Sequence, residues 1–223
     1  MELNGQTQQK RVEKRNIPSL TPDQIRAVFL YADKLLATPL LGAQRRGLLA
    51  WVLMTTGLRI SEVYRLDVSD INLTSQTLRV WRHKRYRQST PNDPGWVKGV
   101  RYSGAVRDTI PIHPALAERM RAVIKAPSGP LWIITWNPSK RCAVRTLRQD
   151  WKRFARDSGI PGLPQGVHIT RHTVGTLMGY TGTVFDVMNQ LGHASIANAS
   201  CYVDRNPWRM KEALKIAFDD MLP

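Results

Sequence analysis

The stretch QLGHASIANASCYVD, residues 190–204, places Gly192 and His193 shortly before a single tyrosine, Tyr202. A lone tyrosine in a helical segment is most often a packing residue. It can also attack a phosphodiester, provided that its phenol, with a pKa of about 10, loses its proton as it attacks. That reaction needs arginines to hold the charge of the transition state, and a lysine or histidine to protonate the leaving 5′-oxygen.

The chain is strongly basic. It has 33 Lys+Arg against 17 Asp+Glu, which gives a net charge of +16 and a pI of about 10.5. Eight of the basic residues lie within residues 79–107 and seven within residues 140–156, and each block holds one acid. Clusters of this kind favour contact with phosphates over a face that is merely solvated. The predicted partner is therefore a polyanion, most often nucleic acid.

The length and composition exclude several classes of protein. The 223 residues allow a substantial core, in one domain or two small ones. No apolar run approaches the roughly 20 residues that span a bilayer, and residues 1–16 lack the apolar segment of a secretory signal. Cys142 and Cys201 match no metal-ligand spacing. We expect a cytoplasmic, nucleoid-associated protein with no metal site and no membrane contact.

Hydrophobic periodicity and capping residues predict a mainly helical α+β fold with a small antiparallel sheet. Thr21, Pro22 and Gln24 form a helix start with a capping box, and Gly57 and Gly192 are typical helix ends. The two predicted strands are residues 76–83 and 105–113, joined by a polar loop or extended hairpin. The predicted helices cover residues 22–36, 43–56, 60–66, 114–126, 144–160, 170–180, 184–191, 195–203 and 207–222.

The side chains that a tyrosine nucleophile needs are present elsewhere in the chain. The segment TTGLRISE carries Arg59 at the start of a short predicted helix, where backbone N–H groups also favour an anion. The segment HITRHT carries His168 and Arg171, which share one face if this turn is helical. Lys84 lies at or just after a predicted strand, in RVWRHKRYR.

These segments resemble the catalytic domain of the tyrosine recombinases, the phage integrase family. TGLRISE resembles that family's first-arginine box, and HITRHT its H-x-x-R box, with Thr170 where leucine is usual. LGHASIANASCY resembles its L-G-H box, followed nine residues later by the nucleophile. The resemblance runs from about Leu20 to Tyr202, and the three boxes in order make it specific.

The resemblance implies a role for each residue. Tyr202 attacks the scissile phosphate and forms a 3′-phosphotyrosine, while Arg59 and Arg171 bind the non-bridging oxygens. His168 and His193 hydrogen-bond the phosphate, and His168 assists the deprotonation of Tyr202. Glu62 orients the site, and Lys84 protonates the leaving group, with Lys98 as the alternative. His172 and Cys201 are interpreted as packing residues, although His172 can also support the residues that contact the phosphate. The residues expected to contact DNA are Arg82, Arg85, Arg87, Lys98, Arg101, Lys140, Arg141, Arg145, Arg148 and Lys152.

The resemblance also implies an assembly. Four protomers, monomeric in solution, would exchange strands at a specific double-stranded recombination site through a Holliday junction, as in DNA integration by mobile elements. No ATP or metal is implied, and accessory DNA-bending proteins are expected partners. We expect a basic N-terminal arm in residues 1–19 and a catalytic domain in 20–205. The helix in 206–223 either completes its own core or docks on a neighbouring protomer.

The pattern leaves alternatives open. The chain is either an excised catalytic domain or a compact recombinase, because the catalytic pattern begins near Leu20 without an N-terminal DNA clamp. A type IB topoisomerase uses the same chemistry to relax DNA. A basic DNA-binding regulator with this fold would bind DNA without cutting it.

Overall fold

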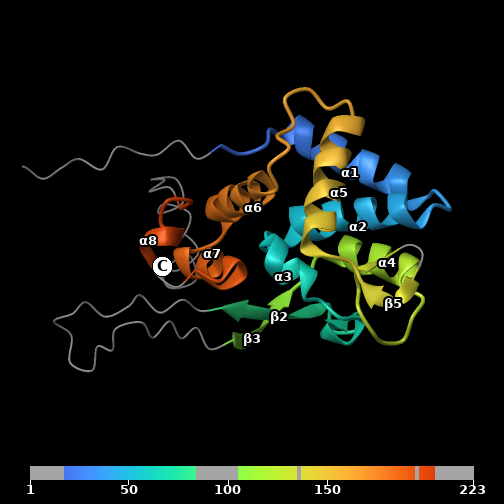
Figure 1. The fold of residues 1–223 in the computed structure, drawn as a ribbon. Helices are drawn as coiled ribbons and strands as arrows, with labels where there is room; N and C mark the ends of the chain where they lie inside the picture. Colours follow the sequence, from blue (N-terminus) through green and yellow to red (C-terminus); the bar gives the residue numbers. More distant parts are fainter. Residues whose placement is uncertain (1–17, 84–104, 135–136, 194–195, 204–223) are drawn as a thin grey trace, which may run out of the picture.

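The computed structural model describes residues 18–83, 105–134, 137–193 and 196–203 (Figure 1). The described helices are α1 (Pro22–Leu36), α2 (Leu41–Thr56), α3 (Ile60–Tyr64), α4 (Pro114–Val123), α5 (Val144–Asp157), α6 (His168–Thr181), α7 (Val184–Leu191) and α8 (Ile196–Ala199), with one 3-10 turn, Val68–Asp70. The strands are β1 (Ile71–Asn72), β2 (Thr77–His83), β3 (Ala105–Pro111), β4 (Ile133–Ile134) and β5 (Asn137–Arg141). The predicted class, mainly helical α+β with a small antiparallel sheet, is confirmed.

Helix α2 lies at the centre of the fold and contacts α1, α4, α5 and α6. It is apolar around most of its circumference, and residues 47–54 are all buried, which is the pattern of a helix covered on every side. The predicted capping box at Thr21 starts α1, and Gly57 ends α2 with a positive φ of 65°. These local signals begin and end the two helices that organise the large core.

The three-stranded sheet has the order β1-β2-β3 with antiparallel pairing throughout, from Thr77 opposite Pro111 to His83 opposite Ala105. Leu78 and Val80 point into the large core, while Arg79 and Trp81 alternate outward. The sequence did not predict β1 or the small β4–β5 pair. Strands β1 and β4 have only two residues each, which is too few to show a period.

Helices α6, α7 and α8 form a second, smaller unit beside the first (Figure 1). It has its own hydrophobic cluster of Val174, Val187, Leu191 and Ala199, against which Tyr202 packs. Helix α6 begins at His168, two residues earlier than predicted, and α8 is shorter than the predicted 195–203. Tyr202 therefore lies in the turn that follows α8.

Candidate active site

Arg59 stands at the N-terminus of α3, where Glu62 fixes its position. The Glu62 carboxylate accepts hydrogen bonds from the Arg59 backbone N–H at 2.8 Å and from its Nη1 at 3.0 Å. Glu62 is buried, whereas the Arg59 side chain is 41 % exposed. The pairing therefore leaves the guanidinium partly accessible to an anion in solvent.

Arg171 is buried on α6 and connects three helices. Its Nη1 donates to the carbonyl of Gly57 at 2.9 Å, and its Nη2 donates to the carbonyl of Leu191. Burial, followed by the positive charge of Arg59, lowers the pKa of the Arg171 guanidinium to about 10, with Glu62 acting in the opposite direction. Arg171 thus stays charged at neutral pH and lies within electrostatic reach of Arg59.

The hydroxyl of Tyr202 contacts His172, which was predicted from the sequence to be a packing or supporting residue. The Nδ1 atom of His172 lies 2.8 Å from the Tyr202 oxygen. His168, one helical turn earlier, is exposed and has no such contact among the hydrogen bonds described. Burial, followed by the thiol of Cys201, raises the pKa of the Tyr202 phenol, while Arg171 and Arg59 act to lower it. At neutral pH the phenol is protonated.

Two glycines on α6 make room for this tyrosine. A Cβ on Gly175 would lie 2.8 Å from the Tyr202 ring, and a Cβ on Gly179 would overlap the Tyr202 carbonyl. The spacing of four residues puts both glycines on one helix face. It was the one sequence signal for this contact, because glycine within a helix often marks a close approach of another segment.

The ring of His193 also lies near the Tyr202 ring. The two rings are nearly parallel, at 18°, with centroids 5.9 Å apart. Burial, followed by the charges of Arg171 and Arg59, lowers the pKa of His193 to about 4, so the imidazole is neutral at pH 7. Its Nδ1 is buried without a hydrogen-bond partner among the described residues. An unpaired buried nitrogen can receive a ligand or a water.

Arg82 corrects a prediction. It was expected to contact DNA, but its side chain is buried on β2 and donates to the carbonyls of Asn189 at 2.8 Å and Gln190 at 2.7 Å. Its Nε also lies 3.5 Å from an Asp108 carboxylate oxygen. A Cβ at Gly192 would overlap the Arg82 guanidinium. Arg82 therefore holds the end of α7 and the approach to His193 against β2, and does not face solvent.

Arg141 also departs from its expected role as a surface contact. Its guanidinium donates to the carbonyls of Tyr64 and Leu66 and to the Asp67 carboxylate. It lies over the Tyr64 ring, 5.5 Å from the ring centroid. Most of its hydrogen-bonding capacity is thus used within the fold.

Cys201, interpreted as a packing residue, is instead exposed.

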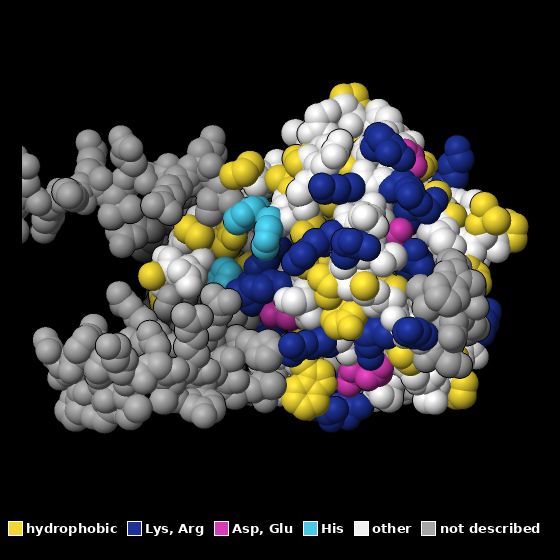
Figure 2. Space-filling view, in the orientation of Figure 1, with side chains coloured by type: hydrophobic (Ala, Val, Ile, Leu, Met, Phe, Trp, Pro, Cys, Tyr) yellow, Lys and Arg dark blue, Asp and Glu magenta, His cyan; other side chains and the backbone are white. Residues whose placement is uncertain are grey.

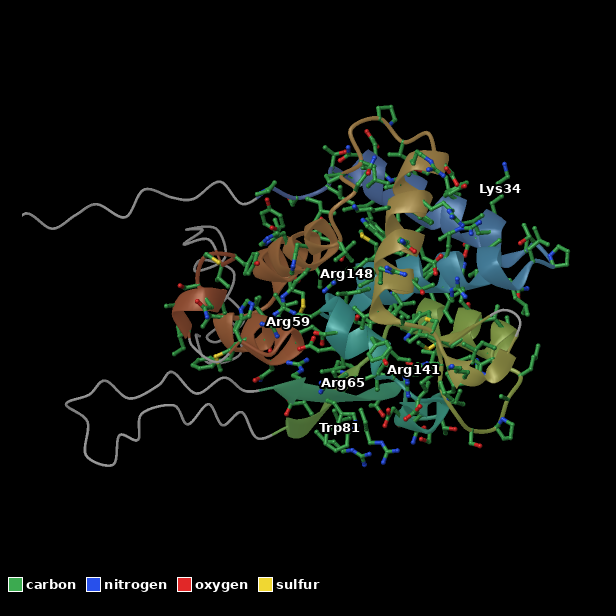
Figure 3. The ribbon with its side chains drawn as sticks, viewed as in Figure 1. Lys34, Arg59, Arg65, Trp81, Arg141 and Arg148 are labelled. Atoms are coloured by element: carbon green, nitrogen blue, oxygen red, sulfur yellow. The ribbon has the colours of Figure 1, made fainter. Side chains whose placement is uncertain are left out.

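A basic face adjoins the histidines of the tyrosine site. Figure 2 shows Lys and Arg side chains spread over the face in view, with histidines gathered at one end. Arg59, Arg65 and Arg148 lie along this face in Figure 3, on or beside α3 and α5, and Arg65 was not among the predicted DNA contacts. Four of the predicted contacts are exposed: Lys140, Arg145, Arg148 and Lys152.

The sequence model of the phage integrase family matches residues 18–209, which is most of the chain. The chain belongs to the phage integrase family. The match covers every residue described above and confirms the resemblance seen in the sequence.

Curated relatives carry the name of one kind of tyrosine recombinase. The XerC recombinase of Mycobacterium bovis (strain BCG / Pasteur 1173P2) is 28 % identical over 162 residues, which cover 72 % of this chain and 49 % of the relative. XerC of Bifidobacterium longum is 24 % identical, over 79 % of this chain and 48 % of the relative. The chain thus spans about half the length of the curated relatives it matches.

Solved structures of other integrases share this fold. The catalytic domain of bacteriophage HP1 integrase is matched with a TM-score of 0.57 and 18 % identity, over 92 % of this chain and 96 % of that domain. The XerH recombinase bound to its difH substrate is matched with a TM-score of 0.61 and 19 % identity, over 90 % of this chain and 55 % of that one. The first of these identifies the integrase catalytic-domain fold.

Several predicted residues lie outside the part of the integrase chain that the structure describes: Lys84, Arg85, Arg87, Lys98, Arg101 and the segments 1–17 and 204–223. Lys84 directly follows His83, the last residue of β2. Within the described residues, no group of three or more His, Cys, Asp or Glu side chains is arranged to hold a metal ion. No helix among those residues is long and apolar enough to cross a membrane.

Proposed function

We propose that this chain is the catalytic part of a site-specific DNA recombinase, in which Tyr202 cleaves one strand and stays bound to its 3′-phosphate. One observation carries the proposal. The Tyr202 hydroxyl contacts His172, the Tyr202 ring lies near the ring of His193, and the charges of Arg171 and Arg59 act on the phenol. A tyrosine that only packs would not need this set of titratable and charged neighbours.

The chemistry would proceed by attack in line with the leaving oxygen. As the phenol oxygen bonds to phosphorus, negative charge grows on the non-bridging oxygens. Arg59 and Arg171 are fixed beforehand by Glu62 and by backbone carbonyls, so little reorganisation is needed when that charge appears. The buried Nδ1 of His193 is a further candidate to bind the phosphate. The phosphotyrosine would retain the bond energy, so a 5′-hydroxyl of a partner strand could reverse the step.

The leaving 5′-oxygen needs a proton, and Lys84 remains our candidate for this role, with Lys98 as the alternative. Both lie outside the described residues, but Lys84 follows β2 immediately. Arg82, two residues before Lys84, fixes β2 against the end of α7 and the turn before His193. The strand that leads to Lys84 is thereby anchored at the tyrosine site.

The basic face would hold the duplex. Arg145, Arg148 and Lys152 are exposed on α5, and each phosphate contact contributes to salt-dependent binding. Replacing Arg148 with Gln should reduce the slope of log K against log salt by about 1. The matched control is Lys34→Gln, because Lys34 is exposed on α1, away from Arg59 and Arg148 (Figure 3). An equal reduction of this slope in the two variants would argue against DNA binding at this face.

The decisive experiment is covalent trapping. DNA crosslinked to the chain is sequenced, and the recovered site is synthesised with a nick near the cleavage point, so that religation is prevented. We expect a covalent protein–DNA adduct that disappears in Tyr202→Phe. Binding without any adduct would favour a regulator. Relaxed plasmid without recombinant products would favour a type IB topoisomerase.

Recombination further requires an assembly, which we propose to be four protomers on two DNA sites, monomeric before synapsis, with a Holliday junction as intermediate. DNA-bending accessory proteins remain proposed partners. Residues 206–223, outside the described part, are proposed to dock on a neighbouring protomer. Truncation after Asp204 should then abolish synapsis in a gel-shift assay, while unchanged synapsis would refute the docking. The basic arm in residues 1–19 is proposed to add affinity for DNA.

A further inference from the structure

The contact between His172 and Tyr202 raises the question of which atom accepts the phenol proton. Arg59 and Arg171, whose charges act on Tyr202, have N–H donors and no acceptor. The nearby Glu62 carboxylate already accepts two hydrogen bonds from Arg59. Two imidazoles lie near Tyr202, and the Nδ1 of His172, 2.8 Å from the phenol oxygen, is the one with a hydrogen bond to it among the described contacts.

We propose that His172 is the base that takes the phenol proton when Tyr202 attacks, an inference that rests on the proposed function above. The imidazole would carry its hydrogen on Nε2, which leaves the lone pair of Nδ1 directed at the phenol. As the bond from the Tyr202 oxygen to phosphorus forms, its O–H bond breaks and the proton moves to Nδ1. The bond from phosphorus to the 5′-oxygen breaks, and the general acid protonates that oxygen.

The reverse reaction uses the same group. When a 5′-hydroxyl attacks the phosphotyrosine, the bond from phosphorus to the Tyr202 oxygen breaks. The His172 imidazolium then returns its proton to the departing phenolate. His172 is therefore a base in cleavage and an acid in rejoining.

The charges around His172 suit a transient base. Burial, followed by the charges of His168 and Arg171, lowers the pKa of His172, so its imidazole is neutral at pH 7 and free to accept a proton. His193 lies near Tyr202 as well and interacts with His172 electrostatically. A DNA phosphate adds negative charge to this cationic cluster, which favours the imidazolium when it is needed.

A structural role and a base can be separated by His172→Asn. The amide of asparagine stands near the position of Nδ1 and can accept the Tyr202 hydrogen bond, but it cannot take up the proton. We expect the first-order rate of adduct formation on the nicked substrate to fall about 10²–10⁴-fold at pH 7, with unchanged DNA affinity and thermal unfolding. The control is His113→Asn, since His113 is an exposed N-cap of α4 and asparagine caps equally well.

Two further readouts identify the step. Because the pKa of His172 is lowered, the unaltered chain should keep its cleavage rate at about pH 6.5, the ordinary pKa of histidine, and lose it only at lower pH. His172→Asn should flatten that decline. A substrate with sulfur in place of the bridging 5′-oxygen has a leaving group that needs no proton. It should rescue a variant that lacks the general acid, such as Lys84→Ala, and should not rescue His172→Asn.

The outcomes distinguish this inference from the proposed function. If the unaltered chain forms no adduct, the proposed function fails and this inference fails with it. If the chain forms an adduct and His172→Asn matches its rate and pH profile, only the base assignment is overturned. Rescue of His172→Asn by the sulfur substrate would also overturn it, because His172 would then act on the leaving group.

Discussion

The large core around α2 and the small cluster beneath Tyr202 differ greatly in extent. The first joins helices α1 to α5, the sheet and the start of α6, whereas the second has four buried residues on α6, α7 and α8. Arg59 belongs to the first region and Tyr202 to the second. Stability within a protein follows the density of buried contacts. The arginine proposed to bind phosphate is therefore held firmly, and the proposed nucleophile is held weakly.

Polar contacts connect the two regions. Arg171 and Arg82 donate across the boundary to carbonyls, and the Gln190 amide donates to the carbonyl of Thr56 at 3.2 Å. Apolar packing between two bodies tolerates sliding, while a guanidinium fork holds its partners in one orientation. The position of Tyr202 relative to Arg59 is therefore set largely by hydrogen bonds from two buried guanidinium groups.

The largest difference should appear on truncating a core residue in each region. Leu53→Ala truncates a fully buried side chain of α2 and should lower the free energy of unfolding by about 2–5 kcal/mol. The whole chain should then unfold at a lower denaturant concentration. Val187→Ala, also fully buried, should cost about 1–3 kcal/mol and mainly accelerate hydrogen exchange in α7. Equal, global effects would mean that the two regions unfold as one.

The boundary is tested by Arg82→Met, which leaves two carbonyls at the end of α7 without their donor. We expect a loss of about 2–4 kcal/mol in chemical denaturation, because buried carbonyls lose their side-chain donor and Asp108 loses its ion pair with Arg82. Arg107→Met on the paired strand β3 is the control, since Arg107 is exposed over the Trp81 ring and should cost less than about 1 kcal/mol. Similar losses in both variants would contradict a bridging role.

A smaller effect on stability, with a large effect on the site, is expected for Gly179→Ala. Alanine favours a helix over glycine by about 1 kcal/mol, but its Cβ would overlap the Tyr202 carbonyl, and such overpacking costs about 1–3 kcal/mol. The melting temperature should change little while adduct formation drops about tenfold. Gly166→Ala, where nothing lies within 4 Å of the added carbon, should cleave normally. Normal cleavage by Gly179→Ala would show that the glycine is not needed to seat Tyr202.

The smallest effect concerns pH. The pKa of His193 is about 4 in the fold and about 6.5 when unfolded. Between these two pH values the unfolded chain binds a proton and the folded chain does not. The free energy of unfolding should therefore decline as the pH falls from about 6.5 towards 4. Comparing denaturant midpoints at pH 7 and pH 5 for the unaltered chain and His193→Asn checks this. Identical pH dependence in both would exclude His193 as a contributor.

Local chemistry was readable from the sequence, and contacts between distant segments were not. Thr21, Gly57 and Gly192 end or begin helices as predicted, because caps depend on neighbouring residues. The burial of Arg82 depends on α7, more than a hundred residues away, and a basic block gives no sign of it. The pairing of His172 with Tyr202 depends on how the chain turns after α8, where neither period nor capping applies.

Arg171 donates two hydrogen bonds to the protein itself, through Nη1 and Nη2. A guanidinium has five N–H donors, so three remain for a bound phosphate. A lysine has three donors on a single nitrogen and could not satisfy both carbonyls while also reaching an anion. Replacing Arg171 with lysine would therefore give up one of these contacts, unless the ends of α2 and α7 change with it.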